Sequence, residues 1–190
     1  MVLQPTGRII DSNPHLNYIS NQILSFKQQK KDNMKLAKLT RLIAIRHCDN
    51  VSGDKLSDFG TKQAKRLGII IKELLNGNNS IIILSSPTGR ARETGAIIAC
   101  EIEGGAKIEI KEVDELESDE YGDGVTQVNA IGGFINNFCN VIVITHHTSP
   151  SGIMNAFSQA NFGISFPCMV SRKGTGFVFA TETHKVSPIS

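Results

Sequence analysis

Short, continuously apolar segments alternate with longer segments of helical spacing through most of this chain, and no other feature restricts its fold as strongly. The segments Ile81–Leu84 and Val141–Ile144 contain no polar residue. Strands of this kind are buried on both faces, which is typical of a parallel sheet covered by helices on both sides. The pattern therefore predicts an α/β fold with three layers, α/β/α, and a mostly parallel sheet.

The expected elements follow this alternation from Leu42 onward. Strands are expected at residues 42–45, 81–84, 107–113 and 141–144, with a final strand at 176–180. Helices are expected at about residues 57–76, 88–103, 125–138 and 153–162. Ser57 is placed to cap the first of these helices and Thr88 the second, because hydroxyl side chains accept hydrogen bonds from the first turn of a helix.

The first part of the chain differs from the rest. Apolar residues from Leu16 to Phe26 have helical spacing, and a stretch rich in lysine follows them. We therefore predict a helical extension over residues 1–39 and one domain over residues 40–190. The basic helix is expected to pack on the domain, and the alternative is a helix that binds a membrane surface or a partner.

The composition excludes several classes of function. Twenty Lys and Arg residues against 18 Asp and Glu give a formal charge of +2, too balanced to indicate a nucleic-acid partner. No apolar run approaches the roughly 20 residues of an integral membrane segment. The four cysteines form no C-x-x-C pair, and the first residues have no signal-peptide pattern. We expect a cytoplasmic protein with reduced thiols; these are Cys48, Cys100, Cys139 and Cys168.

Polar residues follow three of the expected strands at the point where each strand ends. They form the segments Arg46–Cys48, Ser85–Arg90 and Thr145–His147. In α/β sheets, ligands bind beyond the carboxyl ends of the strands. Two arginines and up to three histidines can therefore converge there, which makes this edge of the sheet a candidate anion site.

These segments resemble the signature of the histidine phosphatase superfamily, also called the phosphoglycerate-mutase-like family. Four blocks stand in the family's order between about residues 40 and 150: Arg46-His47-Cys48, Leu56-Ser57-x-x-Gly60-x-x-Gln63-Ala64, Ser85-Ser86-Pro87-x-x-Arg90-Ala91-x-Glu93-Thr94, and a strand that ends in His146. The chain is most similar to the small, phosphohistidine-phosphatase-type members of this family. It departs from the pattern at Cys48, where the family usually has a small residue such as Gly or Ala.

The resemblance implies a reaction and a role for each matched residue. His47 would be the nucleophile that forms a phosphohistidine, and Arg46, Arg90 and His146 would bind the phosphoryl group. Adjacent side chains on a strand point to opposite faces, so His146 and His147 are not both expected to line the site. The family pattern places the histidine first after the strand, which favours His146.

The proton donor for the leaving group is less narrowly defined by the sequence. We expect it to be Glu115, with Glu117 as the second choice. Both lie among seven acids: Glu112, Asp114, Glu115, Glu117, Asp119, Glu120 and Asp123.

The expected function is hydrolysis of a phosphomonoester or a phosphohistidine, with no cofactor and no metal. Its substrate would be a phosphorylated small molecule or a phosphoprotein. A zinc site from His47, Cys48 and His146 would lack a fourth ligand and would face two arginines. Two alternatives are a phosphoglycerate-mutase-type phosphotransferase and a non-catalytic phosphate-binding or interaction module. The short chain leaves the site open to water, which favours hydrolysis over transfer. The sequence does not indicate an oligomeric state.

Overall fold

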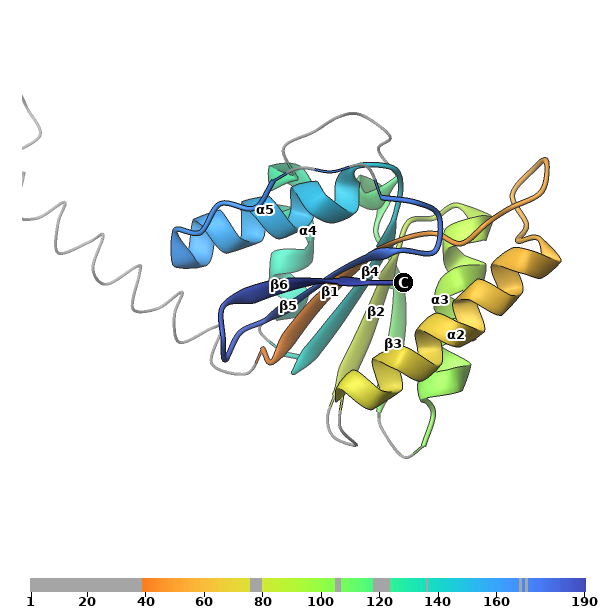
Figure 1. Cartoon of the computed structure of the whole chain (residues 1–190), viewed down its shortest axis with the longest axis horizontal. Helices are drawn as coiled ribbons and strands as arrows, with labels where there is room; N and C mark the ends of the chain where they lie inside the picture. Colours follow the sequence, from red (N-terminus) through yellow and green to blue (C-terminus); the bar gives the residue numbers. More distant parts are fainter. Residues whose placement is uncertain are drawn as a thin grey trace, which may run out of the picture. The chain divides into compact units, whose positions relative to one another are not determined.

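A six-stranded sheet forms the centre of the part of the chain that the computed structural model describes (Figure 1). The described residues are 39–75, 80–104, 107–117, 124–135, 137–167, 169 and 171–190. The helical extension predicted over residues 1–39 lies outside them apart from Leu39. The extension and its boundary with the domain stay predictions.

The sheet has the strand order β3-β2-β4-β1-β5-β6. Its parallel part consists of β1 (Arg41–Arg46), β2 (Ile81–Ser85), β3 (Ile108–Glu112) and β4 (Asn140–Thr145). Two antiparallel strands, β5 (Gly176–Ala180) and β6 (Lys185–Ile189), extend it beyond β1. The mostly parallel sheet is confirmed, but the sequence analysis missed β6. This edge strand is largely exposed and contains Pro188, so it has no apolar alternation to reveal it.

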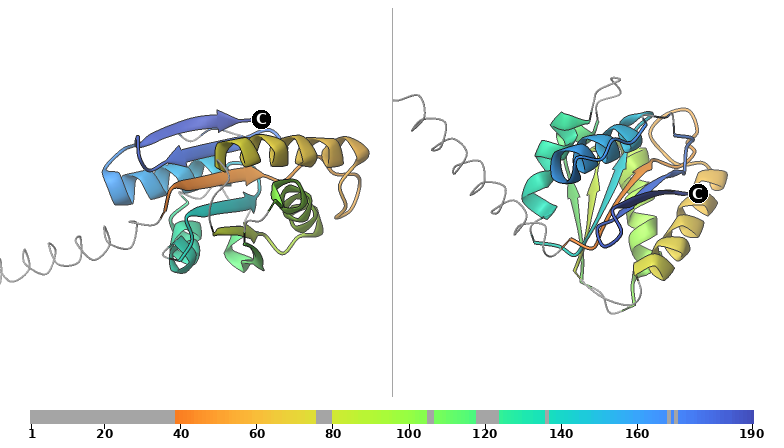
Figure 2. Two further views of the ribbon diagram at one scale, coloured as in Figure 1. Left: turned by 90° about the horizontal axis from the view of Figure 1, so that it is seen from below. Right: turned by 60° about the vertical axis from the view of Figure 1, so that its left-hand side comes forward.

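Four α-helices cover the two faces of the sheet, as predicted. The helices α2 (Asp58–Leu75) and α3 (Gly89–Ile102) pack side by side on one face (Figure 2). The helices α4 (Val125–Ile135) and α5 (Ser149–Phe162) cover the other face. A short 3₁₀ helix, η2 (Asp114–Leu116), follows β3. None of the helices within the described residues is apolar over a length that could cross a bilayer.

The ends of the helices differ from the sequence expectation at two places. The helix α5 begins at Ser149, earlier than expected, because Pro150 in its first turn has a backbone compatible with a helix start. Ser57 caps α2 as predicted, since its Oγ accepts the N–H of Gly60 at 2.9 Å. Thr88 occupies the N-cap position of α3 but makes no side-chain capping bond. That prediction was wrong, because the first backbone N–H groups of α3 donate to the carboxylate of Asp54 instead.

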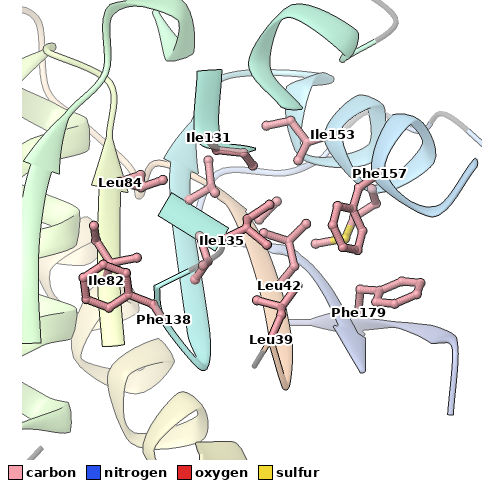
Figure 3. Close-up of a cluster of buried hydrophobic side chains, with 14 of the residues drawn as sticks. Leu39, Leu42, Ile82, Leu84, Ile131, Ile135, Phe138, Ile153, Phe157 and Phe179 are labelled. Carbon is pink, nitrogen blue, oxygen red and sulfur yellow. The ribbon is translucent and has the colours of Figure 1, made fainter. Parts of the chain in front are cut away.

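The strands bury both faces, and each face contributes to its own hydrophobic cluster. Leu42 and Ala44 of β1 point to the α4/α5 side, and Ile43 and Ile45 point to the α2/α3 side. Figure 3 shows the first cluster, in which Phe157, Phe179 and their neighbours fill the space between the sheet and α5.

The strand order places the carboxyl ends of β2, β4 and β1 next to one another. In register, Arg46 of β1 lies opposite Thr145 of β4, and Ser85 of β2 lies opposite Ile144. The residues that follow these three strands therefore meet at one edge of the sheet, which is where the sequence placed the candidate anion site.

We predict that Phe157→Ala destabilises the protein by about 3–5 kcal/mol, because it empties a fully buried site in the cluster of Figure 3. The ring also packs edge-on against Phe179, with ring centroids 5.3 Å apart. Urea unfolding followed by circular dichroism measures this. Phe59→Ala is the matched control, since Phe59 is 64% exposed and its loss should change stability by less than about 0.5 kcal/mol. Equal effects of the two substitutions would contradict the packing described.

Candidate active site

His47 directly follows β1 and is only 3% exposed. Its Nδ1 lies 2.8 Å from the backbone carbonyl of Cys48, and its Nε2 lies 3.3 Å from Nε of Arg90. A carbonyl oxygen can only accept a hydrogen bond, and a guanidinium N–H can only donate one. The imidazole is therefore the neutral tautomer with its proton on Nδ1 and a lone pair on Nε2.

The electrostatic surroundings keep this ring neutral. Burial lowers the pKa of the His47 imidazole from 6.5 to about 4, since a buried ring cannot keep the hydration that stabilises its charged form. The hydrogen bond to the Cys48 carbonyl raises this pKa, and the neighbouring His146, Arg90 and Arg46 lower it. An imidazole that stays neutral has a nitrogen lone pair available for nucleophilic attack.

Arg90 lies in the first turn of α3, and each of its three guanidinium nitrogens faces a different partner. Nε donates to Nε2 of His47, and Nη2 donates to Nδ1 of His146 at 3.4 Å. Nη1 lies 3.3 Å from Oδ1 of Asp54, with which it forms an ion pair. The guanidinium thus joins the two histidines and remains partly accessible to solvent, with 24% of the side chain exposed.

His146 follows β4 and is 1% exposed. Its ring centroid lies 5.0 Å from that of His47. The guanidinium of Arg90 lies at its Nδ1, and its Nε2 lies 2.9 Å from Oγ of Ser86. The adjacent His147 is exposed and has a positive φ of 33°. The structure therefore brings His146 rather than His147 to His47, which is the choice that the family pattern favoured.

Arg46, the last residue of β1, is positioned by the segment that precedes β5. Its Nη1 donates to the backbone carbonyl of Ser171 at 2.8 Å. Its charge lies close enough to lower the pKa of His47. Two guanidinium groups from different elements thus lie near one neutral imidazole, and guanidinium geometry suits the oxygens of a phosphoryl group.

Glu115 is not in contact with the histidines. It lies in η2, and the backbone of that helix reaches the site, because Oγ1 of Thr145 donates to the Leu116 carbonyl at 2.9 Å. The side chains of Glu115 and Glu117 are exposed and make no hydrogen bond or ion pair with another described residue. Of the other acids named above, Asp119, Glu120 and Asp123 lie outside the described residues.

Cys48 is fully buried, and its side chain belongs to the hydrophobic cluster beneath α2 and α3. Burial raises the pKa of its thiol to about 12, so the group stays protonated. Its N–H donates to Oγ1 of Thr94 at 3.1 Å, and that hydroxyl donates to the Arg90 carbonyl at 2.7 Å. The extra bulk at this position is therefore accommodated in the core, and the backbone of Cys48 is linked to α3.

Sequence reasoning missed the contacts that hold the loop after the nucleophile. The N–H of Asp49 donates to Oε1 of Gln63 at 2.9 Å, and Nε2 of Gln63 donates to the Lys173 carbonyl at 3.1 Å. Nζ of Lys173 also forms an ion pair with Asp49 at 3.3 Å. Gln63 matched the family pattern, but one of its partners, Lys173, lies more than a hundred residues away in the sequence. No local signal in the sequence could have identified them.

Asp54 and Ser86 were also missed as parts of the site. Ser86 was named only as part of the third signature block, and its bond to His146 depends on β2 lying beside β4. Asp54 lies in a loop without motif context. The described residues contain no group of three His, Cys, Asp or Glu side chains arranged to hold a metal ion.

Comparisons with solved structures support the fold. No protein-family profile and no curated protein match the sequence. A protein from Agrobacterium tumefaciens assigned as the phosphohistidine phosphatase SixA matches with a TM-score of 0.52 and 17% identity, over 80% of this chain and 96% of its own. The protein histidine phosphatase SixA in complex with tungstate matches with a TM-score of 0.53 and 15% identity, over 79% of this chain and 94% of its own. The chain is thus similar in fold to structures of the histidine phosphatase superfamily.

We predict that the His47 imidazole titrates with a pKa of about 4 in the free protein. Because this pKa is lowered, the ring should be neutral at neutral pH and should gain its proton only as the pH falls through about 4. Carbon-detected or proton-detected NMR of the histidine rings measures the titration, and His47→Gln assigns the signal. A midpoint at or above 6.5 would contradict the burial and the charge arrangement described here.

Proposed function

We propose that this chain, which has the fold seen in histidine phosphatase structures, hydrolyses phosphate groups through a phosphohistidine on His47. The observation that carries the proposal is the state of the His47 ring. The Cys48 carbonyl holds the proton on Nδ1, and the lone pair on Nε2 faces the guanidinium of Arg90. A nucleophile and a cation that binds phosphate therefore meet at one point.

In the first step, the lone pair of His47 Nε2 attacks phosphorus, and the bond from phosphorus to the leaving oxygen or nitrogen breaks. The imidazole gains positive charge as the N–P bond forms. The Nδ1–H···O bond to Cys48 stabilises that charge, since the carbonyl dipole already points at this N–H. Arg90 must move off the lone pair and donate to the phosphoryl oxygens, which carry the charge of the transferring group.

In the second step, a water molecule attacks the phosphorus of the phosphohistidine. The N–P bond breaks, and its electron pair returns to Nε2, so that inorganic phosphate leaves and His47 is again neutral. His146 lies beside this nitrogen, with its ring centroid 5.0 Å from that of His47, and Arg46 supplies a second permanent positive charge. Both groups would stabilise the phosphoryl oxygens in each step.

Glu115 would give a proton to the leaving oxygen and would later take one from the attacking water. Its support is its place in η2, whose backbone is bonded to the residue before His146. This role matters most for alkyl phosphates, because an alkoxide is a poor leaving group. A phosphohistidine substrate needs less help, since its leaving group is an imidazole.

The proposed reaction needs no metal ion, because the arginine side chains supply the positive charge that a metal ion would otherwise supply. The guanidinium of Arg90 lies between the two histidines, where it would repel a metal ion bound to both. The substrate would be a phosphorylated small molecule or a phosphoprotein. The described cysteines Cys48, Cys100 and Cys139 are free thiols, which fits the proposed location in the cytoplasm.

We predict that the purified protein hydrolyses p-nitrophenyl phosphate in the presence of EDTA, and that His47→Ala lowers the rate by about a thousandfold or more. The nucleophile has no substitute, so its loss removes the covalent route. Release of p-nitrophenolate measures the rate. His184→Ala is the control, since the ring of this histidine lies tilted against that of Phe162, with ring centroids 4.4 Å apart, and makes no contact with the site.

Three outcomes would contradict the proposal. Turnover that EDTA abolishes would show that a metal ion supplies the charge assigned here to the arginines. Phosphate binding without turnover of p-nitrophenyl phosphate, phosphohistidine or alkyl phosphates would instead establish a phosphate-binding module. Full activity in His47→Ala would exclude His47 as the nucleophile.

A further inference from the structure

Asp54 makes contacts that neither the fold nor the family pattern led us to expect. Its carboxylate accepts hydrogen bonds from the backbone N–H groups of Gly89 and Arg90, the first two residues of α3. The same carboxylate forms the ion pair with Nη1 of Arg90. One side chain therefore binds both the backbone and the guanidinium of the arginine that faces His47.

Gly89 is needed for this contact. A Cβ on Gly89 would lie 2.7 Å from the backbone oxygen of Asp54 and 2.8 Å from its Oδ2. Both distances are too short for a carbon beside an oxygen, so any side chain on Gly89 would displace the Asp54 segment. The close approach of the Asp54 segment to the start of α3 is therefore possible only with glycine at position 89.

A further hydrogen bond attaches the loop that carries Asp54 to α3. The N–H of Leu56 donates to the carboxylate of Glu93, one turn further along the helix, at 2.8 Å. Asn50 and Leu56 close the loop with an isolated bridge. The loop between β1 and α2 is therefore fixed on both sides of Asp54, although the Asp54 side chain is 54% exposed.

Asp54 is the only carboxylate among the described residues that contacts the guanidinium of Arg90. The other two partners of this group are the rings of His47 and His146, which offer one weak acceptor each at 3.3 and 3.4 Å. A carboxylate binds a guanidinium more strongly than a neutral ring nitrogen does. The ion pair with Asp54 is therefore the strongest of the contacts that orient the Arg90 side chain.

We propose that Asp54 is a positioning residue that holds the Arg90 guanidinium at the phosphate-binding position. The proposal rests on the proposed function for the identity of the ligand. Asp54 lies on the far side of the guanidinium from the histidines, and Arg90 has five N–H donors. It can therefore keep one of them on Asp54 while others turn from the rings to the phosphoryl oxygens. Asp54 acts through Arg90 and touches neither the nucleophile nor the reacting phosphorus.

The test is calorimetric binding of inorganic phosphate, together with the kinetics of p-nitrophenyl phosphate hydrolysis. The variants are Asp54→Ala, which removes all three contacts, and Asp54→Asn, which keeps an oxygen for the backbone N–H groups but loses the charge. Gly89→Ala displaces the Asp54 segment without changing Asp54. Asp58→Ala is the matched control, because this exposed acid at the start of α2 has no contact with Arg90.

We expect Asp54→Ala to raise the Kd for phosphate and the KM for p-nitrophenyl phosphate by about fivefold, as a partly exposed charged hydrogen bond should. Gly89→Ala should have a similar effect, and Asp54→Asn a smaller one. Asp58→Ala should leave both constants unchanged. In an Arg90→Ala background, Asp54→Ala should cause no further loss, because its effect passes through the missing guanidinium. A general effect on folding would instead add to the loss of Arg90.

Three results would overturn the proposal. Tighter phosphate binding by Asp54→Ala would show that Asp54 competes with phosphate for Arg90 and does not position it. Full additivity with Arg90→Ala, or an equal effect of Asp58→Ala, would show that Asp54 acts on stability or on net charge alone. Phosphate binding is measured without turnover, so an inactive wild type would contradict the proposed phosphatase but would leave this test of Asp54 intact.

Discussion

The site depends on one guanidinium group that joins three elements of the fold. Arg90 extends from α3 and reaches His47 after β1, His146 after β4 and Asp54 in the loop before α2. His47 and Asp54 are seven residues apart, but Arg90 and His146 are each more than 30 residues from them and from one another in the sequence. They meet because β1, β4 and β2 are neighbours and end at one edge of the sheet. The strand order is therefore what brings these four residues together at one site.

The same geometry explains how a histidine can act as a nucleophile beside two arginines. A ring in water would be partly protonated near its ordinary pKa, and burial removes the hydration that favours this form. The positive neighbours act in the same direction, so the groups that would bind the phosphoryl charge also keep the nucleophile neutral. The Cys48 carbonyl raises the pKa of His47 by accepting a hydrogen bond from Nδ1. Because the proton is held on Nδ1, the free lone pair is on Nε2, the nitrogen that faces Arg90.

The sequence predicted the parts of the fold and the site that rest on local patterns. Continuous apolar strands, helical spacing and the blocks around His47 and Arg90 are readable over short windows, and the choice of His146 over His147 followed from the family pattern. The edge strand β6 lacks such a pattern, and the order of strands that places Ser86 beside His146 is a long-range property. Asp54 caps α3 in place of Thr88 because the loop between β1 and α2 folds back onto that helix. A contact between this loop and a helix more than 30 residues later cannot be predicted from local sequence patterns.

Trapping the covalent intermediate tests the central claim most directly. The protein would be mixed with p-nitrophenyl phosphate, quenched with base within milliseconds and digested for mass spectrometry. We expect a base-stable, acid-labile phosphoryl group on His47, attached at Nε2, and we expect it to disappear when the reaction is left to complete. Turnover with no phosphorylated peptide, or with the phosphoryl group on another residue, would contradict the account of His47 as the nucleophile.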